Sequence, residues 1–211
     1  MNLFKKYLVC LLITSCMFFA CKQPNGQTSP VPPAQDSLPA NPYAPLDRSQ
    51  MDMSYFPVDF PLQKMNGLKT ELPVARVIYS RPHKNGRVIF GNSENSICHY
   101  GKAWRLGANE GTEISFFKNV IISGKNIAKG SYIIYAIPYA EKWTIILNNN
   151  LYSWGLHIDS TYDIFKMDIP VSPQQPALED FTIVFSDAVY GADLIMAWDN
   201  VKAVLPIEFS K

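Results

Sequence analysis

The sequence predicts an all-β fold, a single antiparallel β-sandwich, with an open β-barrel as the alternative. From about Met51 onward, apolar and polar residues alternate with a period of two almost everywhere, which is typical of strands with one buried face. Eight or more short segments of this kind are separated by Gly, Asn and Pro. We find no amphipathic pattern long enough for a helix of three turns and no internal repeat. Residues 51–211 are therefore expected to form one β domain.

Two segments near the middle of the chain are expected to be central strands. Residues 131–138 and 143–147 are apolar on both faces, as strands covered on both sides of a sheet are. Before them, Ile114 and Phe116 are two residues apart and share one face of a predicted strand.

The C-terminal third alternates more regularly and predicts four further strands. Asp199 and Asn200 are suited to a tight hairpin turn before the last strand. Pro173 and Pro176 are expected in a loop before the strand at Phe181, and Pro206 marks the last strand as an edge or its end. The predicted inward faces carry Phe165, Met167 and Ile169; Phe181, Ile183 and Phe185; Leu194, Met196 and Trp198; and Val201, Ala203, Leu205, Ile207 and Phe209.

The first 20 residues have the layout of a secretory signal. Lys5 and Lys6 precede an apolar run that ends at Ala20, and Cys21 follows at once. A cysteine directly after the cleavage position is typical of a bacterial lipoprotein signal, in which the thiol is lipidated. Cys16 follows residues that fit the usual cleavage motif better, but the polar segment begins directly after Cys21, so we predict lipidation at Cys21.

Residues 21–50 are predicted to be a tether between the lipid and the domain. The segment has seven prolines and few large apolar residues, so it cannot bury enough surface to offset the loss of chain entropy on folding. We expect the protein in the cell envelope, attached to a membrane through its lipid anchor, with the outer membrane favoured over the inner.

Charge and cysteine content argue against a nucleic-acid-binding protein and against a domain held together by disulfides. The 19 Lys and Arg against 18 Asp and Glu give a formal net charge of +1, and loss of Lys5 and Lys6 with the signal takes it to −1. A near-neutral chain argues against a nucleic-acid partner, whose binding needs many phosphate contacts. Cys98 is the only cysteine after Cys21, so no disulfide within the domain is expected.

Several long motif words resemble a known family. They are "VIYSRPHKNGRVIFG", "YGKAWRLGANE", "GSYIIYAIP", "WTIIL" and "WG", in this order between Pro73 and Phe209. The chain resembles the bacterial family known as the domain of unknown function numbered 2911. The resemblance implies a secreted or lipid-anchored envelope protein with a β-rich domain. It implies no catalytic residues.

A group of polar residues in loop-like sequence falls on these motif words. Its Arg side chains, carboxamide and carboxylate are suited to an anionic or polyhydroxyl ligand, because guanidinium groups match carboxylates and phosphates. The structural alternative, which we favour, is that Arg105 or Arg81 pairs with Glu110 and orders the loops while Trp104 closes the end of the sandwich. The candidate ligand-binding or loop-ordering residues are Arg81, Arg87, Trp104, Arg105, Asn109 and Glu110.

The remaining reactive side chains form no recognisable catalytic motif. His83, His99 and His157 lack the spacing of a metal site, so surface or loop positions are expected for them, and we predict neither a metal nor a cofactor. Cys98 and His99 are adjacent in an extended chain and point apart, so His99 cannot activate the thiol.

Two functions remain open at this point. The favoured one is a non-enzymatic binding or accessory module displayed on a tether, with an envelope protein or glycan as its partner. The alternative is an envelope hydrolase or isomerase that acts on a glycan or peptide, with Glu110 as acid or base and Arg105 setting its pKa. The position of Glu110, in an open cleft or sealed beneath Trp104, would separate the two.

Overall fold

The computed structural model of the protein describes residues 49–68, 71–152 and 155–209. The predicted signal, the predicted lipidation site Cys21 and nearly all of the predicted tether lie outside these residues. The chain divides into two units, Met1–Leu46 and Asp47–Lys211, and the described residues belong to the second. Among them, no helix is long and apolar enough to cross a membrane.

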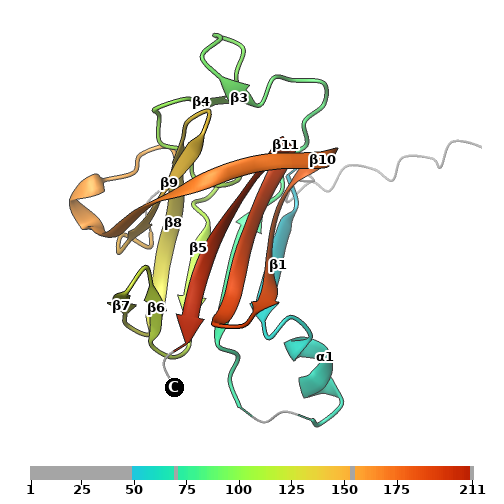
Figure 1. Cartoon of the computed structure of the whole chain (residues 1–211), viewed down its shortest axis with the longest axis vertical. Coiled ribbons are helices and arrows are strands. Elements are labelled where there is room, and N and C mark those ends of the chain that lie inside the picture. The colour runs from blue at the N-terminus through green and yellow to red at the C-terminus, as the bar shows by residue number, and fades with distance from the viewer. Residues whose placement is uncertain (1–48, 69–70, 153–154, 210–211) are drawn as a thin grey trace, which may run out of the picture. The chain divides into compact units, whose positions relative to one another are not determined.

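Strands make up most of the second unit, as the sequence predicts (Figure 1). Nine of them form one antiparallel sheet in the order β1-β2-β5-β8-β9-β10-β11-β6-β7, and the sheet does not close into a barrel. The elements are β1 (Met51–Phe56), α1 (Phe60–Met65), β2 (Ala75–Ser80), β3 (Phe90–Gly91), β4 (Cys98–His99), β5 (Glu113–Phe116), β6 (Val120–Ile122), β7 (Lys125–Ile127), β8 (Gly130–Pro138), β9 (Lys142–Asn148), the 3-10 helix η1 (Ser160–Tyr162), β10 (Asp163–Ala188) and β11 (Gly191–Phe209).

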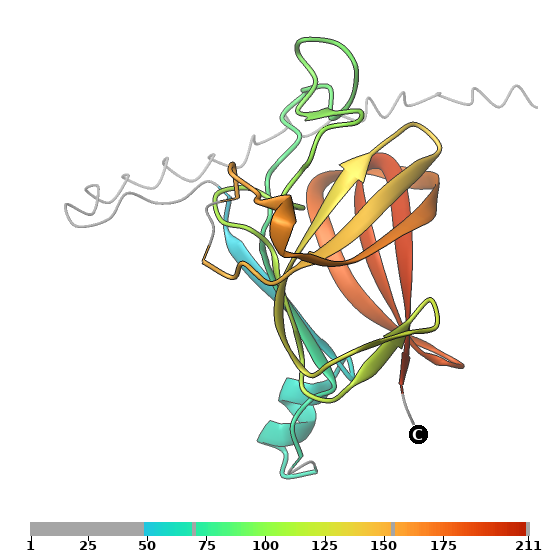
Figure 2. The ribbon, with the colours of Figure 1, turned by 90° about the vertical axis from the view of Figure 1, so that its left-hand side faces the viewer.

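The sheet bends into two facing layers, and β10 passes from one layer to the other. Its residues 163–170 pair with β9, whereas residues 171–188 pair with β11. One layer therefore contains β1, β2, β5, β8 and β9, and the other contains β11, β6 and β7 (Figure 2). A single cluster of buried apolar side chains from both layers forms the core. This arrangement agrees with the predicted all-β sandwich.

The chain reverses at Asp199–Asn200, within β11. An extended strand of 19 residues would place its ends about 60 Å apart. The backbone N–H of Phe209 nevertheless donates to the carbonyl of Tyr190, which precedes β11, at 3.3 Å. Asp199 has a φ of 53°, and a positive φ at the first central residue is typical of the tight turns of β-hairpins. The predicted hairpin turn is thus confirmed, although pairing with β10 keeps the whole segment in strand conformation.

The predicted loop around Pro173 and Pro176 is wrong as a break between strands, because both prolines belong to the single strand β10 in the structure. Two register shifts occur there instead, one between Pro173 and Leu178 and one between Leu178 and Thr182. Proline cannot donate to a ladder, so an irregular stretch of pairing is where a strand tolerates it. Through these shifts, β10 passes around the tip of the β11 hairpin. Residues 171–173 of β10 pair with one arm of the hairpin, and residues 182–188 pair with the other.

The predicted inward faces agree with the structure. β8 and β9 are buried on both faces between β5 and β10, as central strands. The inward residues of the last four segments are buried, except that Met167, Val201 and Phe209 are half-buried at the margin of the core.

Candidate functional site

The stretch "YGKAWRLGANE" forms an excursion from the edge of β8. Trp104 pairs with Ala136 through two backbone hydrogen bonds of 2.7 and 2.9 Å, and Thr112 accepts the N–H of Ile134 at 2.9 Å. Residues 105–111 leave the sheet between these two positions and return to begin β5. We call this excursion the 105–111 loop. Loops of this kind, with their ends close together, commonly carry function.

The 105–111 loop is closed by hydrogen bonds from the residue that follows it. The Thr112 hydroxyl donates to the carbonyl of Leu106 at 2.6 Å, and its N–H donates to the carbonyl of Arg105 at 3.3 Å. Leu106 and Asn109 have φ values of 53° and 58°, although neither is glycine. A buried leucine in this region costs on the order of 1 kcal/mol, so the surrounding contacts must hold the loop in its shape.

Trp104 lies at the centre of an aromatic cluster between the two layers. Its indole N–H donates to the carbonyl of Gly107 at 3.3 Å, which ties the ring to the 105–111 loop. Only 8% of Trp104 is exposed. The rings that contact it, with centroids 4.8 to 6.0 Å away, are Phe90, Trp143, Phe181 and Trp198.

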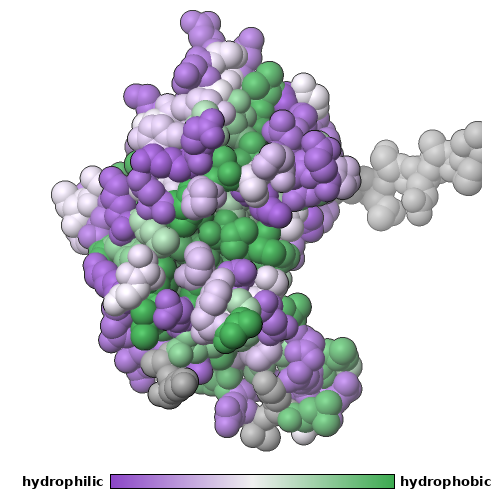
Figure 3. Space-filling view, viewed as in Figure 1, coloured by the Kyte–Doolittle hydropathy of each residue, from purple (hydrophilic) through white to green (hydrophobic). Residues whose placement is uncertain are grey.

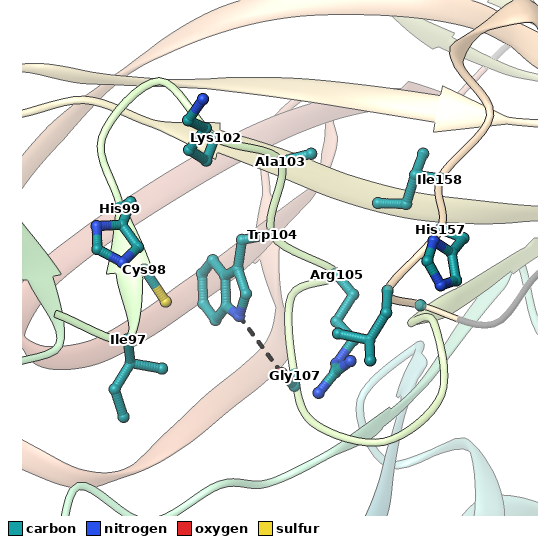
Figure 4. A pocket seen from close by; sticks show the side chains of 12 residues that line it. Ile97, Cys98, His99, Lys102, Ala103, Trp104, Arg105, Gly107, His157 and Ile158 are labelled. Atoms are coloured by element: carbon teal, nitrogen blue, oxygen red, sulfur yellow. Dashed lines mark hydrogen bonds between the residues drawn. The ribbon is translucent and has the colours of Figure 1, made fainter. Parts of the chain in front are cut away.

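A cavity of about 470 Å³ opens beside Trp104, and we call it the Arg105 pocket (Figure 4). Three segments that are distant in sequence form it: β4 with the residues after it, the start of the 105–111 loop, and residues 155–158. In Figure 4, Trp104 stands between Cys98 and His99 on one side and Arg105 and His157 on the other. The lining residues are Ile97, Cys98, His99, Lys102, Ala103, Trp104, Arg105, Gly107, Gly155, Leu156, His157 and Ile158.

The lining of the Arg105 pocket is cationic. Lys102 and Arg105 are charged, His99 and His157 add imidazole rings, and none of the described lining residues carries a carboxylate. Burial lowers the pKa of Arg105 from its ordinary value, and the charge of Glu110 partly offsets this. The guanidinium keeps its charge all the same, because arginine is not deprotonated in folded proteins. A half-buried, permanent cation beside apolar walls is suited to an anionic group.

Cys98 lies on the wall of the pocket but is not a nucleophile there. Its thiol is buried, and burial raises its pKa well above the ordinary value, an effect that the Arg105 charge only partly counteracts. The neutral thiol is the unreactive form. Cys98 therefore contributes an apolar surface to the pocket.

Gly155 fixes the position of the Arg105 side chain. A Cβ atom on Gly155 would lie 2.5 Å from Cδ of Arg105 and 3.0 Å from the backbone nitrogen of Gly111. The backbone at residue 155 thus packs directly on the aliphatic stem of Arg105, and only glycine leaves room for it.

Arg81 belongs to a different cluster and joins three strands. From the end of β2 its guanidinium contacts Asp52 of β1 at 3.2 Å and Thr182 of β10 at 3.4 Å. The hydroxyl of Tyr79 donates to the same carboxylate at 3.1 Å. This arrangement stabilises the approach of β1 and β2 to β10, so the role of Arg81 here is structural.

The other predicted residues are also separate from the pocket. Arg87 is exposed and donates to the backbone carbonyls of His83 and Lys84, which closes its own turn. Asn109 and Glu110 are exposed residues of the 105–111 loop and do not line the pocket. No ion pair joins the described residues Arg105 and Glu110, so the predicted direct pairing of these charges is absent.

Glu110 lines a second, smaller cavity of about 350 Å³ together with Glu113, Ile133 and Tyr152. It is neither sealed beneath Trp104 nor placed in one cleft with Arg105. Of the six predicted residues, the structure therefore brings only Trp104 and Arg105 together in the pocket.

Sequence reasoning missed the other nitrogen-bearing side chains of the pocket. The sequence indicates unrelated surface or loop positions for His99 and His157, and it suggests no role for Lys102, although Lys102 lies two residues before Trp104. His157 is 52 positions beyond Arg105, so only the packing of residues 155–158 on the 105–111 loop places it there.

Fold and site together define a small all-β domain with a cationic pocket beside a buried tryptophan. The chain belongs to the family described as "Protein of unknown function (DUF2911)", whose model matches residues 61–207. This confirms the resemblance drawn from the motif words. Comparison with curated proteins and with solved structures found no match.

Proposed function

We propose that the protein is a lipid-anchored cell-envelope binding module that takes an anionic group of its ligand into the Arg105 pocket. The ligand is a small molecule or a group on an envelope protein or glycan, and it carries a carboxylate, phosphate or sulfate. Binding needs no cofactor and no chemical step. The module is held at the envelope, with the outer membrane favoured, by lipid on Cys21.

The observation that carries this proposal is the one-sided charge of the pocket. Lys102 and Arg105 reach one cavity together with His99 and His157, and no described residue of its lining carries a carboxylate to neutralise the two charges. Its apolar wall, which includes Trp104 and Ile158, lowers the local dielectric and so strengthens attraction between Arg105 and an anion. A volume of about 470 Å³ lies in the range of small-ligand sites.

The enzymatic alternative receives less support from the same geometry. It requires Glu110 and Arg105 to act on one substrate, but these residues line different cavities. Cys98 is a neutral, buried thiol, so it does not replace Glu110 as a reactive group. A binding module accounts for the pocket without a missing catalytic partner.

Calorimetric titration of anions tests the ligand site. Inorganic phosphate, sulfate and glucuronate are titrated into the parent, into Arg105→Gln and into Arg87→Gln. Loss of the guanidinium at position 105 should weaken binding of the best anion at least tenfold, because a charge-assisted, bidentate contact disappears. Arg87→Gln removes the same charge from an exposed turn and should bind like the parent. Equal loss in both variants would point to general charge attraction and contradict the proposal.

Fractionation of Cys21→Ser tests the anchor. The variant should remain uncleaved or leave the membrane fraction, because diacylglycerol and an amide-linked acyl chain together supply the hydrophobic anchoring. Cys16→Ser is the matched control and should fractionate like the parent. If Cys21→Ser is still recovered as a lipid-modified membrane protein, lipid is attached elsewhere and the assignment of Cys21 is wrong.

A further inference from the structure

A lobe of unusual apolarity projects from the domain between β1 and β2. Its described residues are 57–68 and 71–74, and α1 forms its centre (Figures 1 and 2). We call these residues the apolar lobe. Figure 3 shows hydrophobic residues on its outer surface. Its exposed large apolar side chains are Val58, Leu62, Met65, Leu68 and Leu72, with Met65 and Leu68 about three-quarters exposed.

The base of the apolar lobe is attached firmly to the sheet. Phe60 is buried, and its ring packs on Tyr55 of β1 with centroids 5.7 Å apart. The N–H of Val74 donates to the carbonyl of Phe56 at 2.8 Å, which closes the lobe where the chain enters β2. Because α1 is held by Phe60 on its inner face, Leu62 and Met65 face outward.

Neighbouring residues extend the same surface. Phe56 at the base of the lobe packs on Phe209, with ring centroids 4.9 Å apart, and the N–H of Phe209 donates to the carbonyl of Tyr190. The exposed turn Val189–Tyr190 therefore lies beside the base of the lobe. Lys118 also lies there, with its ammonium 5.1 Å from the Phe209 ring.

Charges on this end of the domain are mixed. Among the described residues at this end, Lys64 and Lys118 are matched by the exposed carboxylates of Asp59 and Glu71, and the sequence adds one further lysine, Lys69. A surface that combines exposed Leu, Met and Val with a tyrosine and lysines has the composition of side chains at a membrane interface. Because the excess of positive charge is small, attachment would come mainly from apolar insertion rather than from attraction to anionic lipid.

We infer that the apolar lobe docks on a phospholipid bilayer and forms a second attachment of the anchored protein. This inference rests on the lipid anchor of the proposed function. A chain of the length of residues 21–50 reaches at most roughly 100 Å. The six residues of β1, which separate the end of that segment from the lobe, span only about 20 Å. The bilayer is thus always within reach of the lobe. Because the anchor gives the lobe a high effective concentration at the membrane, weak insertion is enough to keep it docked.

Spin labelling of the mature, lipidated protein tests the inference. The protein is reconstituted into vesicles of phosphatidylethanolamine and phosphatidylglycerol, and a label is attached at Met65→Cys or, as control, at Val88→Cys. Val88 is an exposed apolar residue outside the lobe, and the native Cys98 is buried away from the reagent. Collision with oxygen, which concentrates in lipid, is compared with collision with a water-soluble nickel chelate.

The Met65 label should be reached several-fold better by oxygen than by nickel, and the Val88 label should show the reverse. Water-like accessibility at both sites would overturn the inference and leave the anchor intact. Dipolar broadening between the labels at position 65, without a preference for oxygen, would show that the lobe contacts a second copy of the protein. This result would also overturn the inference. A protein that does not float with the vesicles would refute the anchor, and the inference with it.

Discussion

Gly155 controls the position of the Arg105 side chain, on which the proposed ligand site depends. Gly155→Ala places a methyl group 2.5 Å from Cδ of Arg105 and 3.0 Å from the backbone of Gly111, so one of these segments must move. We expect a loss of about 1–3 kcal/mol of unfolding free energy, as for other overpacked sites, together with weaker anion binding. Thermal melts and calorimetric titration measure the two effects.

Gly111→Ala is the matched control for this substitution. A Cβ atom there meets only the side chain of Ile133, at 3.4 Å, which is ordinary contact. This variant should retain both stability and binding. If Gly155→Ala behaved like Gly111→Ala, residues 155–158 would not hold Arg105 in place.

At the scale of single residues, the sequence could predict that Arg105 and Trp104 matter, because both lie between glycines in a stretch unlike the surrounding strands. It could not predict where Glu110 would point. The 105–111 loop returns to the sheet before Thr112, so it turns Glu110 toward the second cavity and leaves Arg105 in the first. Whether two charges in a loop form an ion pair depends on the shape of the backbone between them. Here that shape includes the positive φ of Leu106, which the sequence does not indicate.

Among the elements, the contact between β1, β2 and β10 is sensitive to alkaline pH through Tyr79. Burial, with a smaller contribution from Asp52, raises the pKa of Tyr79 from 10.0 to about 12. The stabilisation from a raised pKa is complete below the unfolded value and is lost as pH rises through the folded value. Unfolding free energy should therefore fall between pH 10 and 12, by an amount on the order of 2 kcal/mol for this residue.

Tyr79→Phe tests this contribution. The variant loses the hydrogen bond to Asp52, so it should be about 1 kcal/mol less stable at pH 8, but its decline above pH 10 should be shallower than that of the parent. Urea unfolding at intervals between pH 8 and 12 gives both quantities. Tyr152, which is 97% exposed, supplies the control, since Tyr152→Phe should decline as steeply as the parent. If the unfolding free energy of Tyr79→Phe declined above pH 10 as steeply as that of the parent, groups other than Tyr79 would be its cause.

The elements themselves could be predicted where local pattern decides them. Period-two alternation identified β10 and β11, and Asp199–Asn200 predicted a turn that the structure contains. The loop at Pro173 and Pro176 could not be predicted correctly. Whether such prolines end a strand or lie in an irregular ladder depends on the neighbouring strand, here the β11 hairpin that β10 passes around.

For the whole molecule, the all-β class could be predicted from the sequence, because apolar and polar residues alternate over nearly the entire domain. The pocket did not, because its walls come from β4, the 105–111 loop and residues 155–158, which are brought together only by folding. The same holds for the apolar lobe, whose leucines and methionine have no pattern that distinguishes exposed from buried positions.

Anomalous diffraction from crystals soaked in selenate would show whether an anion binds in the Arg105 pocket. We expect a selenium peak inside the pocket, with selenate oxygens about 2.7–2.9 Å from the guanidinium of Arg105. The peak should be absent from crystals of Arg105→Gln soaked in the same way. Selenate bound only at surface lysines, with none in the pocket of the parent protein, would contradict the proposal.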